Sequence, residues 1–280
     1  MNLRMFPVYS NSPRRLRRVI TPTIASYAAQ ERQLQSSANQ EVLNSKNRFQ
    51  SSSTSAADDV LVYLNQADRE TLLRQQAIDK AQQGQYLDAI DLFTLLIQYN
   101  PNSASNYNNR GLLHFQSGQL NKALIDYDRA LRLNPRLAKV YNNRANCYAA
   151  LGELEFAIAD YETAIDLDPT DIRARLNQGI TFRELELYHE AIESFDLALQ
   201  FSQFLNTTDT VGVPTALEGH IYAERGRTYH ILGDWNCAVA DYHRALARLP
   251  ITYSDREVSY RLRSLVKSWL DDLLSPQQAS

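Results

Sequence analysis

The chain has 280 residues, of which 44% are hydrophobic and 22% are charged, and its formal net charge is −3. These values fit one or two ordinary globular domains, and no stretch approaches the roughly 18 apolar residues that a membrane-spanning helix needs. Residues 1–56 hold eight Lys or Arg and two acids, which leaves a net charge of −9 for the rest of the chain. Because a nucleic-acid-binding body is expected to be basic, this acidic body argues against a nucleic-acid partner.

Residues 1–56 are rich in Ser, Asn, Gln and Arg and show no sustained hydrophobic period. This composition buries too little apolar surface to offset chain entropy, which predicts a disordered arm. The first thirty residues contain five arginines and no acid, as organellar transit peptides do. The same pattern fits a basic arm that touches an anionic membrane surface, or a solvated tail. We expect a cytoplasmic protein, or one in a plastid or other organelle stroma or at a membrane if the arm is a targeting segment.

A repeat organises the rest of the chain. The segment Tyr107–Pro135 returns 34 residues later as Tyr141–Pro169, and this period is typical of stacked helix–turn–helix units. Five copies are predicted, near residues 70–103, 104–137, 138–171, 172–205 and 219–252. The eighth residue of each copy is small: Ala77, Gly111, Ala145, Gly179 and Gly226. The twentieth is Ala89, Ala123, Ala157, Ala191 and Ala238, and the twenty-fourth is aromatic: Phe93, Tyr127, Tyr161, Phe195 and Tyr242.

These residues resemble the tetratricopeptide repeat family. The resemblance implies an all-α fold, a right-handed α-solenoid of five helix–turn–helix repeats over residues 57–252, whose small positions let paired helices approach closely. Glycines between the helices, among them Gly118 and Gly152, fit a left-handed residue that ends the first helix.

Arginine and aspartate recur together inside the repeats. Arg110, Arg144 and Arg225 stand at position seven of the same copies that carry Asp126, Asp160 and Asp241 at position twenty-three. Arginine suits bidentate pairing with a carboxylate, so we predict structural bridges between the paired helices.

The C-terminal part departs from the strict repeat. Residues 206–218 form an insert before copy five, and its Gly212 and Pro214 predict a loop. Residues 253–274 predict a capping helix, because Val258, Leu262, Leu265, Val266, Trp269 and Leu273 form one apolar stripe. Residues 275–280 are expected to be a loose tail.

The sequence contains no constellation that indicates catalysis. The five histidines show no metal-ligand spacing, and no phosphate loop, nucleophile elbow or zinc motif occurs. The two cysteines, Cys147 and Cys237, are expected to be reduced thiols. We therefore predict a protein that is not an enzyme and that has no cofactor, metal or small-molecule substrate.

The resemblance also implies a concave groove lined by positions two, five, six, nine and twelve of each copy. Position six carries Asn109, Asn143 and Asn177 in copies two to four. A carboxamide can donate to and accept from a peptide backbone, and this line resembles the asparagine ladder in the repeat region of O-linked N-acetylglucosamine transferases. The alternative is a row of solvated surface amides.

The predicted groove positions hold several bases and few acids. The candidate peptide-binding residues are Arg74, Asn108, Asn109, Lys139, Asn142, Asn143, Asn146, Arg173, Asn177, Arg183 and Arg227. A basic groove in an acidic body is expected to attract an acidic segment. The alternative is that these bases pair with nearby acids such as Glu184 and Glu224.

From these features we predict an adaptor or scaffold that binds an extended, acidic protein segment in its groove. By family analogy, it could serve the assembly of a larger, membrane-associated complex. The alternative function is that of a structural subunit of a multiprotein complex, held through its convex face or its capping helix.

Overall fold

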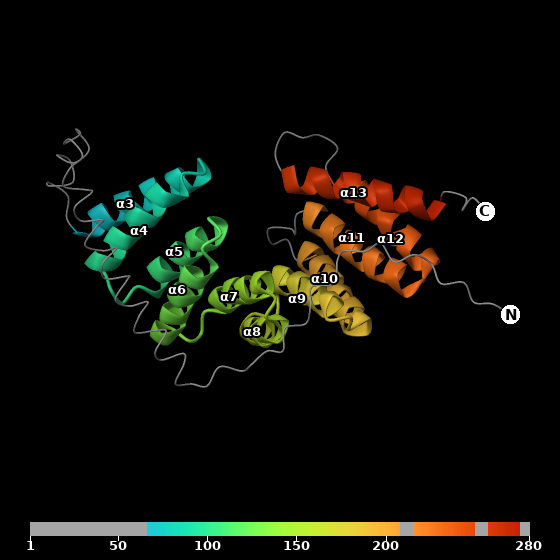
Figure 1. The fold of residues 1–280 in the computed structure, drawn as a ribbon, viewed down its shortest axis with the longest axis horizontal. Coiled ribbons are helices and arrows are strands. Elements are labelled where there is room, and N and C mark those ends of the chain that lie inside the picture. Colours follow the sequence, from blue (N-terminus) through green and yellow to red (C-terminus); the bar gives the residue numbers. More distant parts are fainter. Residues whose placement is uncertain (1–65, 208–214, 250–256, 275–280) are drawn as a thin grey trace. The chain divides into compact units, whose positions relative to one another are not determined.

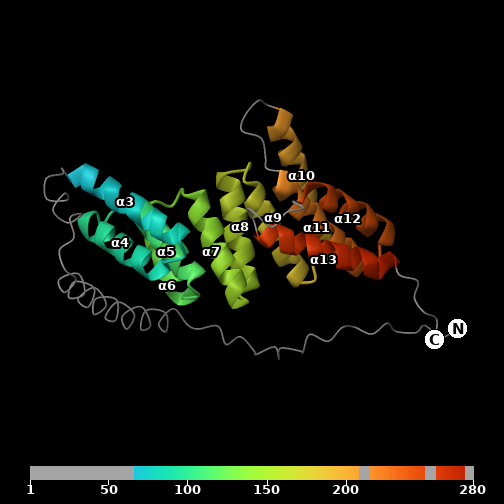
Figure 2. The same cartoon turned by 90° about the horizontal axis from the view of Figure 1, so that it is seen from above.

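The computed structural model describes residues 66–207, 215–249 and 257–274, all within the unit Tyr63–Ser280. The predictions for the arm (residues 1–56), for most of the 206–218 insert and for the tail lie outside the described residues. Every regular element in the described ranges is an α-helix (Figures 1 and 2). The all-α class that the 34-residue period predicts is therefore confirmed.

The helices form five hairpins and one closing helix. The hairpins are α3 (Gln66–Gln82) with α4 (Tyr86–Tyr99), α5 (Ala104–Gln116) with α6 (Leu120–Leu133), α7 (Ala138–Leu151) with α8 (Leu154–Leu167), α9 (Ile172–Glu184) with α10 (Tyr188–Thr207), and α11 (Thr215–Leu232) with α12 (Trp235–Arg248). The closing helix is α13 (Glu257–Leu274). Each helix packs on the next one along the chain, and the first helices α5, α7, α9 and α11 also contact their nearest counterparts. This packing order is that of an α-solenoid.

Small and aromatic residues set the spacing inside each hairpin. Tyr127 is fully buried, and a Cβ added at Gly111 would lie 2.8 Å from its ring. A Cβ at Gly179 would lie 2.6 Å from the ring of Phe195. The alanines at position twenty are also fully buried, so the two helices meet at the places that the sequence predicts.

Four of the five hairpin turns contain a left-handed glycine, and the fourth hairpin is the exception. Gly118 and Gly152 have φ angles of 76° and 80°. In the fourth hairpin the same place is taken by Glu186, with a φ angle of 63°. A residue with a Cβ pays about 1–2 kcal/mol for this conformation, so this turn is locally strained.

The predicted bridges are present, and each arginine makes one contact more than expected. Arg144 Nε and Nη2 donate to both carboxylate oxygens of Asp160 at 2.7 and 2.8 Å. Its Nη1 donates to Asp128 Oδ1 at 2.6 Å, on the second helix of the preceding hairpin. Although burial lowers the pKa of Arg144, the hydrogen bonds and charge of Asp160 and Asp128 raise it overall.

The same arrangement occurs in two other hairpins. Arg110 binds Asp126 at 2.8 and 2.7 Å and reaches Thr94 of α4 at 3.1 Å. Arg225 binds Asp241 at 2.7 and 2.9 Å and reaches Asp196 of α10. We call each of these three-part contacts an arginine clamp; it joins the two helices of a hairpin and ties them to the hairpin before.

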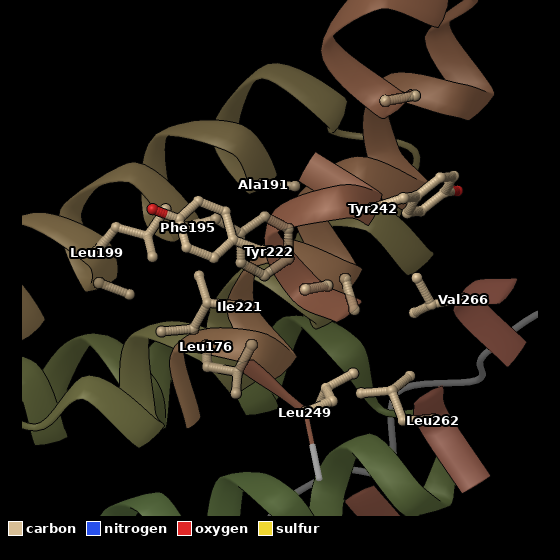
Figure 3. Packing of buried hydrophobic residues seen from close by; sticks show 14 of the residues in the cluster. Leu176, Ala191, Phe195, Leu199, Ile221, Tyr222, Tyr242, Leu249, Leu262 and Val266 are labelled. Atoms are coloured by element: carbon tan, nitrogen blue, oxygen red, sulfur yellow. The ribbon is translucent and has the colours of Figure 1, made fainter. Parts of the chain in front are cut away.

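The closing helix covers the last hairpin. Leu262, Val266 and Leu270 of α13 are buried in one cluster with residues of α9 to α12 (Figure 3). Trp269 packs on the same cluster. One residue of the predicted stripe is wrong: Leu265 is 51% exposed, and Leu270 is buried instead. The helix turns by about 100° per residue, so a stripe read from spacing alone can include a neighbour that faces solvent.

Candidate peptide-binding groove

The eleven predicted groove residues all lie on the first helices of the hairpins, α3, α5, α7, α9 and α11. These helices follow one another along one side of the array, as the direct contacts α5–α7, α7–α9 and α9–α11 show. A line of equivalent positions therefore runs from hairpin to hairpin. The side chains on this line differ in how many of their polar groups already bind another residue of the protein.

Several of these side chains bind one another across neighbouring first helices. Asn143 Nδ2 donates to Asn108 Oδ1 at 2.9 Å and thus links α7 to α5. Asn177 Nδ2 donates to Asn146 Oδ1 at 2.9 Å and links α9 to α7. The predicted asparagine ladder is therefore also a set of bonds that hold the solenoid together.

Three of the five predicted bases make similar links. Arg74 Nη2 donates to Asn106 Oδ1 at 3.2 Å, from α3 to α5. Arg183 forms an ion pair of 2.6 Å with Glu224, from α9 to α11. The guanidinium of Arg227 lies 5.2 Å from the ring centre of Trp269, from α11 to α13. Each of these bases has a partner within the fold.

Arg183 is the clearest departure from the sequence-based expectation. Its side chain is 8% exposed, and it also donates to the backbone carbonyl of Glu224 at 3.1 Å. The alternative that an acid neutralises a groove base therefore applies to Arg183. Two residues 41 positions apart form this pair, so no local pattern indicates it.

Position five faces the helix interfaces more than the groove. Asn108 and Asn142 are buried, as is Leu176 at the same position of α9. The buried Oδ1 of Asn142 has no hydrogen-bond partner among the described residues. Asn109, Asn143 and Asn177 at position six are half-buried, so they remain within reach of a ligand.

Asn146 is held in one orientation by two donors. Its Oδ1 accepts from the hydroxyl of Tyr161 at 2.7 Å and from Asn177 at 2.9 Å. Burial raises the pKa of Tyr161 well above its ordinary value, so the phenol stays protonated and donates. With its oxygen engaged twice, Asn146 can offer its amide nitrogen to a carbonyl group of a bound chain.

Lys139 and Arg173 are the predicted bases whose charge is not engaged. Both side chains are exposed, and neither forms an ion pair with any described residue. Each is the second residue of its helix, α7 and α9 respectively. They lie on neighbouring first helices and give this side of the array two available positive charges.

A pocket between α3, α4 and α5 has a volume of about 350 Å³. Its apolar wall includes Ile78, Phe93 and Leu112, and the amides of Gln82, Asn109 and Gln116 also line it, together with Ala81, Tyr86 and Leu113. Ile78 is 38% exposed, so the pocket opens to solvent. The repeat pattern does not predict this pocket, although apolar residues stand at position nine of the first two copies, Ile78 and Leu112, and are its signal in the sequence.

A second hollow, of about 400 Å³, lies among α10, α11 and α12 and is polar. Its charged lining residues are Asp196, Arg225 and Arg244, and each has a partner of opposite charge, which for Arg244 is Asp241 outside the lining. Asp241 accepts from both Arg225 and Arg244, and Arg225 also binds Asp196. This hollow therefore offers little uncompensated charge to a ligand.

Within the described ranges there is no cluster of three or more His, Cys, Asp or Glu that could hold a metal ion. In the same residues no helix combines the length and the apolar character needed to cross a membrane.

Comparisons with known proteins agree with the fold. The family model described as tetratricopeptide repeat matches residues 138–171, the third predicted copy, and one described as TPR repeat matches residues 111–152. No curated protein sequence matches the chain.

Several solved structures share the arrangement of helices. TTC0263, a thermophilic TPR protein of Thermus thermophilus, is 22% identical with a TM-score of 0.56, over 72% of this chain and 98% of its own. A tetratricopeptide repeat protein from Parabacteroides merdae is 20% identical with a TM-score of 0.54, over 72% and 73%. MamA from Desulfovibrio magneticus RS-1 is 16% identical with a TM-score of 0.54, over 64% and 94%. At these identities the likeness concerns the fold alone.

The stacked hairpins and the line of first helices define a helical-repeat scaffold, a class that works by binding other proteins. The family matches identify residues 111–171 as tetratricopeptide repeats, and the repeat pattern and the shared fold support the same assignment for the other hairpins. Proteins of this family are in general non-enzymatic scaffolds for protein–protein interaction.

Proposed function

We propose that this chain is a non-enzymatic adaptor that holds an extended, acidic segment of a partner protein along its first helices. The observation that carries the proposal is the pair Lys139 and Arg173, two exposed cations on neighbouring helices that form no ion pair with any described residue. The sequences of α5 and α7 contain no Asp or Glu. A negatively charged segment would meet no acid of these two helices on this side.

The contrast with the rest of the body strengthens this proposal. Residues outside the arm carry a net charge of −9, whereas α5 and α7 contain no acid. Such a contrast steers an acidic segment toward the groove and disfavours basic segments.

The amides supply contacts that do not depend on the partner's side chains. The half-buried carboxamides of Asn109, Asn143 and Asn177 and the oriented amide of Asn146 can bond to backbone groups of an extended chain. Arg183 has a different role in this proposal, because its ion pair with Glu224 stabilises the array. The contact residues are therefore these asparagines with Lys139 and Arg173.

The test uses the full chain and a random library of peptides, each about 16 residues long so that an extended chain spans the groove, displayed on phage. Enriched peptides are resynthesised, and their affinities are measured by fluorescence polarisation at two salt concentrations. We expect acidic peptides whose binding weakens with salt. Lys139→Glu with Arg173→Glu should weaken binding about tenfold or more, since two reversed charges together change the binding energy by about 1.4 kcal/mol or more.

A matched variant controls for the overall charge of the protein. Arg132→Glu with Lys267→Glu makes the same change of charge on α6 and α13, where both side chains are exposed. We expect less than a twofold loss of affinity. Peptides without acidic residues, or equal losses in the two double variants, would refute the proposed groove.

A second candidate function is that of a structural subunit held through α13. Leu265 and Leu274 on this helix are 51% and 60% exposed and would contribute apolar contacts to such an interface. The size of the full chain in solution separates the two functions. An adaptor is expected to be a soluble monomer or weak dimer on its own, whereas a structural subunit is expected to aggregate without its complex.

The role of the basic arm is a separate proposal that rests on the sequence of residues 1–56 alone. A net charge of +6 would attract the arm to anionic lipid and bring the adaptor to a membrane-bound complex. Co-sedimentation with phosphatidylserine vesicles, compared with neutral vesicles, tests it; equal sedimentation with both would exclude electrostatic membrane contact.

A further inference from the structure

The pocket between the first two hairpins has the character of a site for one apolar group. Ile78, Phe93 and Leu112 line it, and its volume is about 350 Å³. An apolar cavity of about 150 Å³ already accepts a molecule the size of benzene. The pocket therefore has room for a phenylalanine, leucine or methionine side chain together with part of its backbone.

Polar groups beside the apolar wall suit a peptide better than a free hydrocarbon. Gln82 and Gln116 are exposed at the ends of α3 and α5, and Asn109 lies on the same line as Asn143 and Asn177. Carboxamides can bond to the backbone on both sides of a seated side chain. An occupant is thus expected to present one apolar side chain from a chain that continues along the asparagines.

The pocket and the free cations lie at opposite ends of their helices. Leu112 is near the end of α5, whereas Lys139 and Arg173 are the second residues of α7 and α9. Packed helices are spaced about 8–10 Å apart, and about seven helical residues span about 10 Å. The pocket lies between α3 and α5, so a diagonal path from its centre crosses about one and a half spacings to α7 and about two and a half to α9. The path is therefore about 17 Å long to Lys139 and about 25 Å long to Arg173.

We propose that this pocket anchors a large apolar side chain of the acidic segment and sets its register in the groove. An extended chain rises about 3.3 Å per residue, so the acids that meet Lys139 and Arg173 lie about five and eight residues from the anchor. The partner is then a segment with one apolar anchor and two acidic residues at these distances. This inference rests on the proposed function and adds the recognition pattern.

The experiment extends the peptide selection with the full chain. The enriched peptides are aligned on their large apolar residue, and a representative peptide is resynthesised with that residue replaced by alanine. A third peptide keeps the composition but places the acids within two residues of the anchor. We expect each change to weaken binding at least fivefold.

A variant of the pocket tests the protein side. Ile78→Gln makes the wall polar without adding charge, and the side chain is exposed enough to keep the fold. Leu87→Gln is the matched control, on a residue of α4 that is 63% exposed and does not line the pocket. Ile78→Gln should weaken the representative peptide at least fivefold, and Leu87→Gln less than twofold.

The outcomes separate this inference from the proposed function. Acidic peptides without a fixed apolar residue, or with equal affinity for both glutamine variants, would overturn the anchor and leave the acidic groove in place. Anchored peptides with acids at random distances would overturn the register. Peptides with no acidic preference would overturn the proposed function itself.

Discussion

Removing the arginine of one clamp should lower the stability of the fold more than a substitution of a nearby surface residue does. Arg144→Met removes both bonds to Asp160, whose side chain is only 10% exposed. Loss of one partner of a buried ion pair costs about 3–5 kcal/mol, because the other charge is left without compensation. Arg144 is itself 20% exposed, so we place the loss at the lower end, near about 3 kcal/mol.

That loss corresponds to a measurable change in the melting temperature. In a domain of this size, about 1 kcal/mol shifts the midpoint by about 2–4 °C, so we expect a decrease of about 6–12 °C for Arg144→Met. Thermal unfolding followed by far-ultraviolet circular dichroism and by calorimetry measures it. Adding Asp160→Leu should recover part of the loss, because an apolar pair leaves no buried charge.

Two variants serve as controls. Asp128→Asn breaks only the contact with the preceding hairpin, and Asp128 is 40% exposed, so it should cost less than about 1 kcal/mol. Gln178→Met changes the equivalent position of the fourth hairpin, where, among the described residues, the side chain bonds only to Ser194 at 3.4 Å; it should cost about 1 kcal/mol. The reasoning would be refuted if Arg144→Met were no more destabilising than either control.

Three further predictions concern single residues. Glu186→Gly should raise stability by about 1 kcal/mol, because glycine adopts its positive φ of 63° without strain; an unchanged melting temperature would contradict this. Tyr161→Phe should cost about 1 kcal/mol and weaken peptide binding, because Asn146 loses a donor at 2.7 Å, and calorimetry with polarisation measures both. At a mildly alkaline pH of about 8, a thiol reagent should modify exposed Cys237 first and buried Cys147 only in denaturant, since Cys147 is out of reach and burial raises its pKa to about 11. The hydrogen bond to Asp234 also raises the pKa of Cys237, so its reaction should speed up as the pH rises further; two fast thiols in the native protein would count against this prediction.

The sequence predicts the parts of the fold that repeat. Gly179 opposite Phe195 and Arg144 opposite Asp160 recur in equivalent form, so their roles follow from the period alone. The period does not predict the contact that each clamp makes with the preceding hairpin, because its acceptor varies, from Thr94 in one hairpin to Asp128 in another. A contact between repeats is visible in a pattern only where both of its residues are constant.

The candidate groove is less predictable than the fold, for a physical reason. Groove positions lie where neighbouring first helices meet, so a side chain there can either face a ligand or bind the next helix. Arg183 binds the next first helix through Glu224, whereas Arg173 stays exposed to solvent. The sequence alone does not decide between them, because the choice depends on which residue of α11 comes within reach.

The missing clamp of the fourth hairpin has a mechanical meaning for the groove. At three junctions between hairpins, an arginine of the later hairpin bonds to the second helix of the earlier one, through Thr94, Asp128 or Asp196. At the junction between α8 and α9 the equivalent residue is Gln178, which bonds to Ser194 of its own hairpin instead. On the opposite side, that junction keeps the amide bond between α9 and α7. This junction is therefore held by an amide bond on the groove side and, among the described residues, has no arginine contact on the opposite side. Lys139 and Arg173 stand on α7 and α9, on either side of this junction. The amide bond between these two helices therefore also holds the distance between the two cations, and with it the spacing of the two acids that a partner must present.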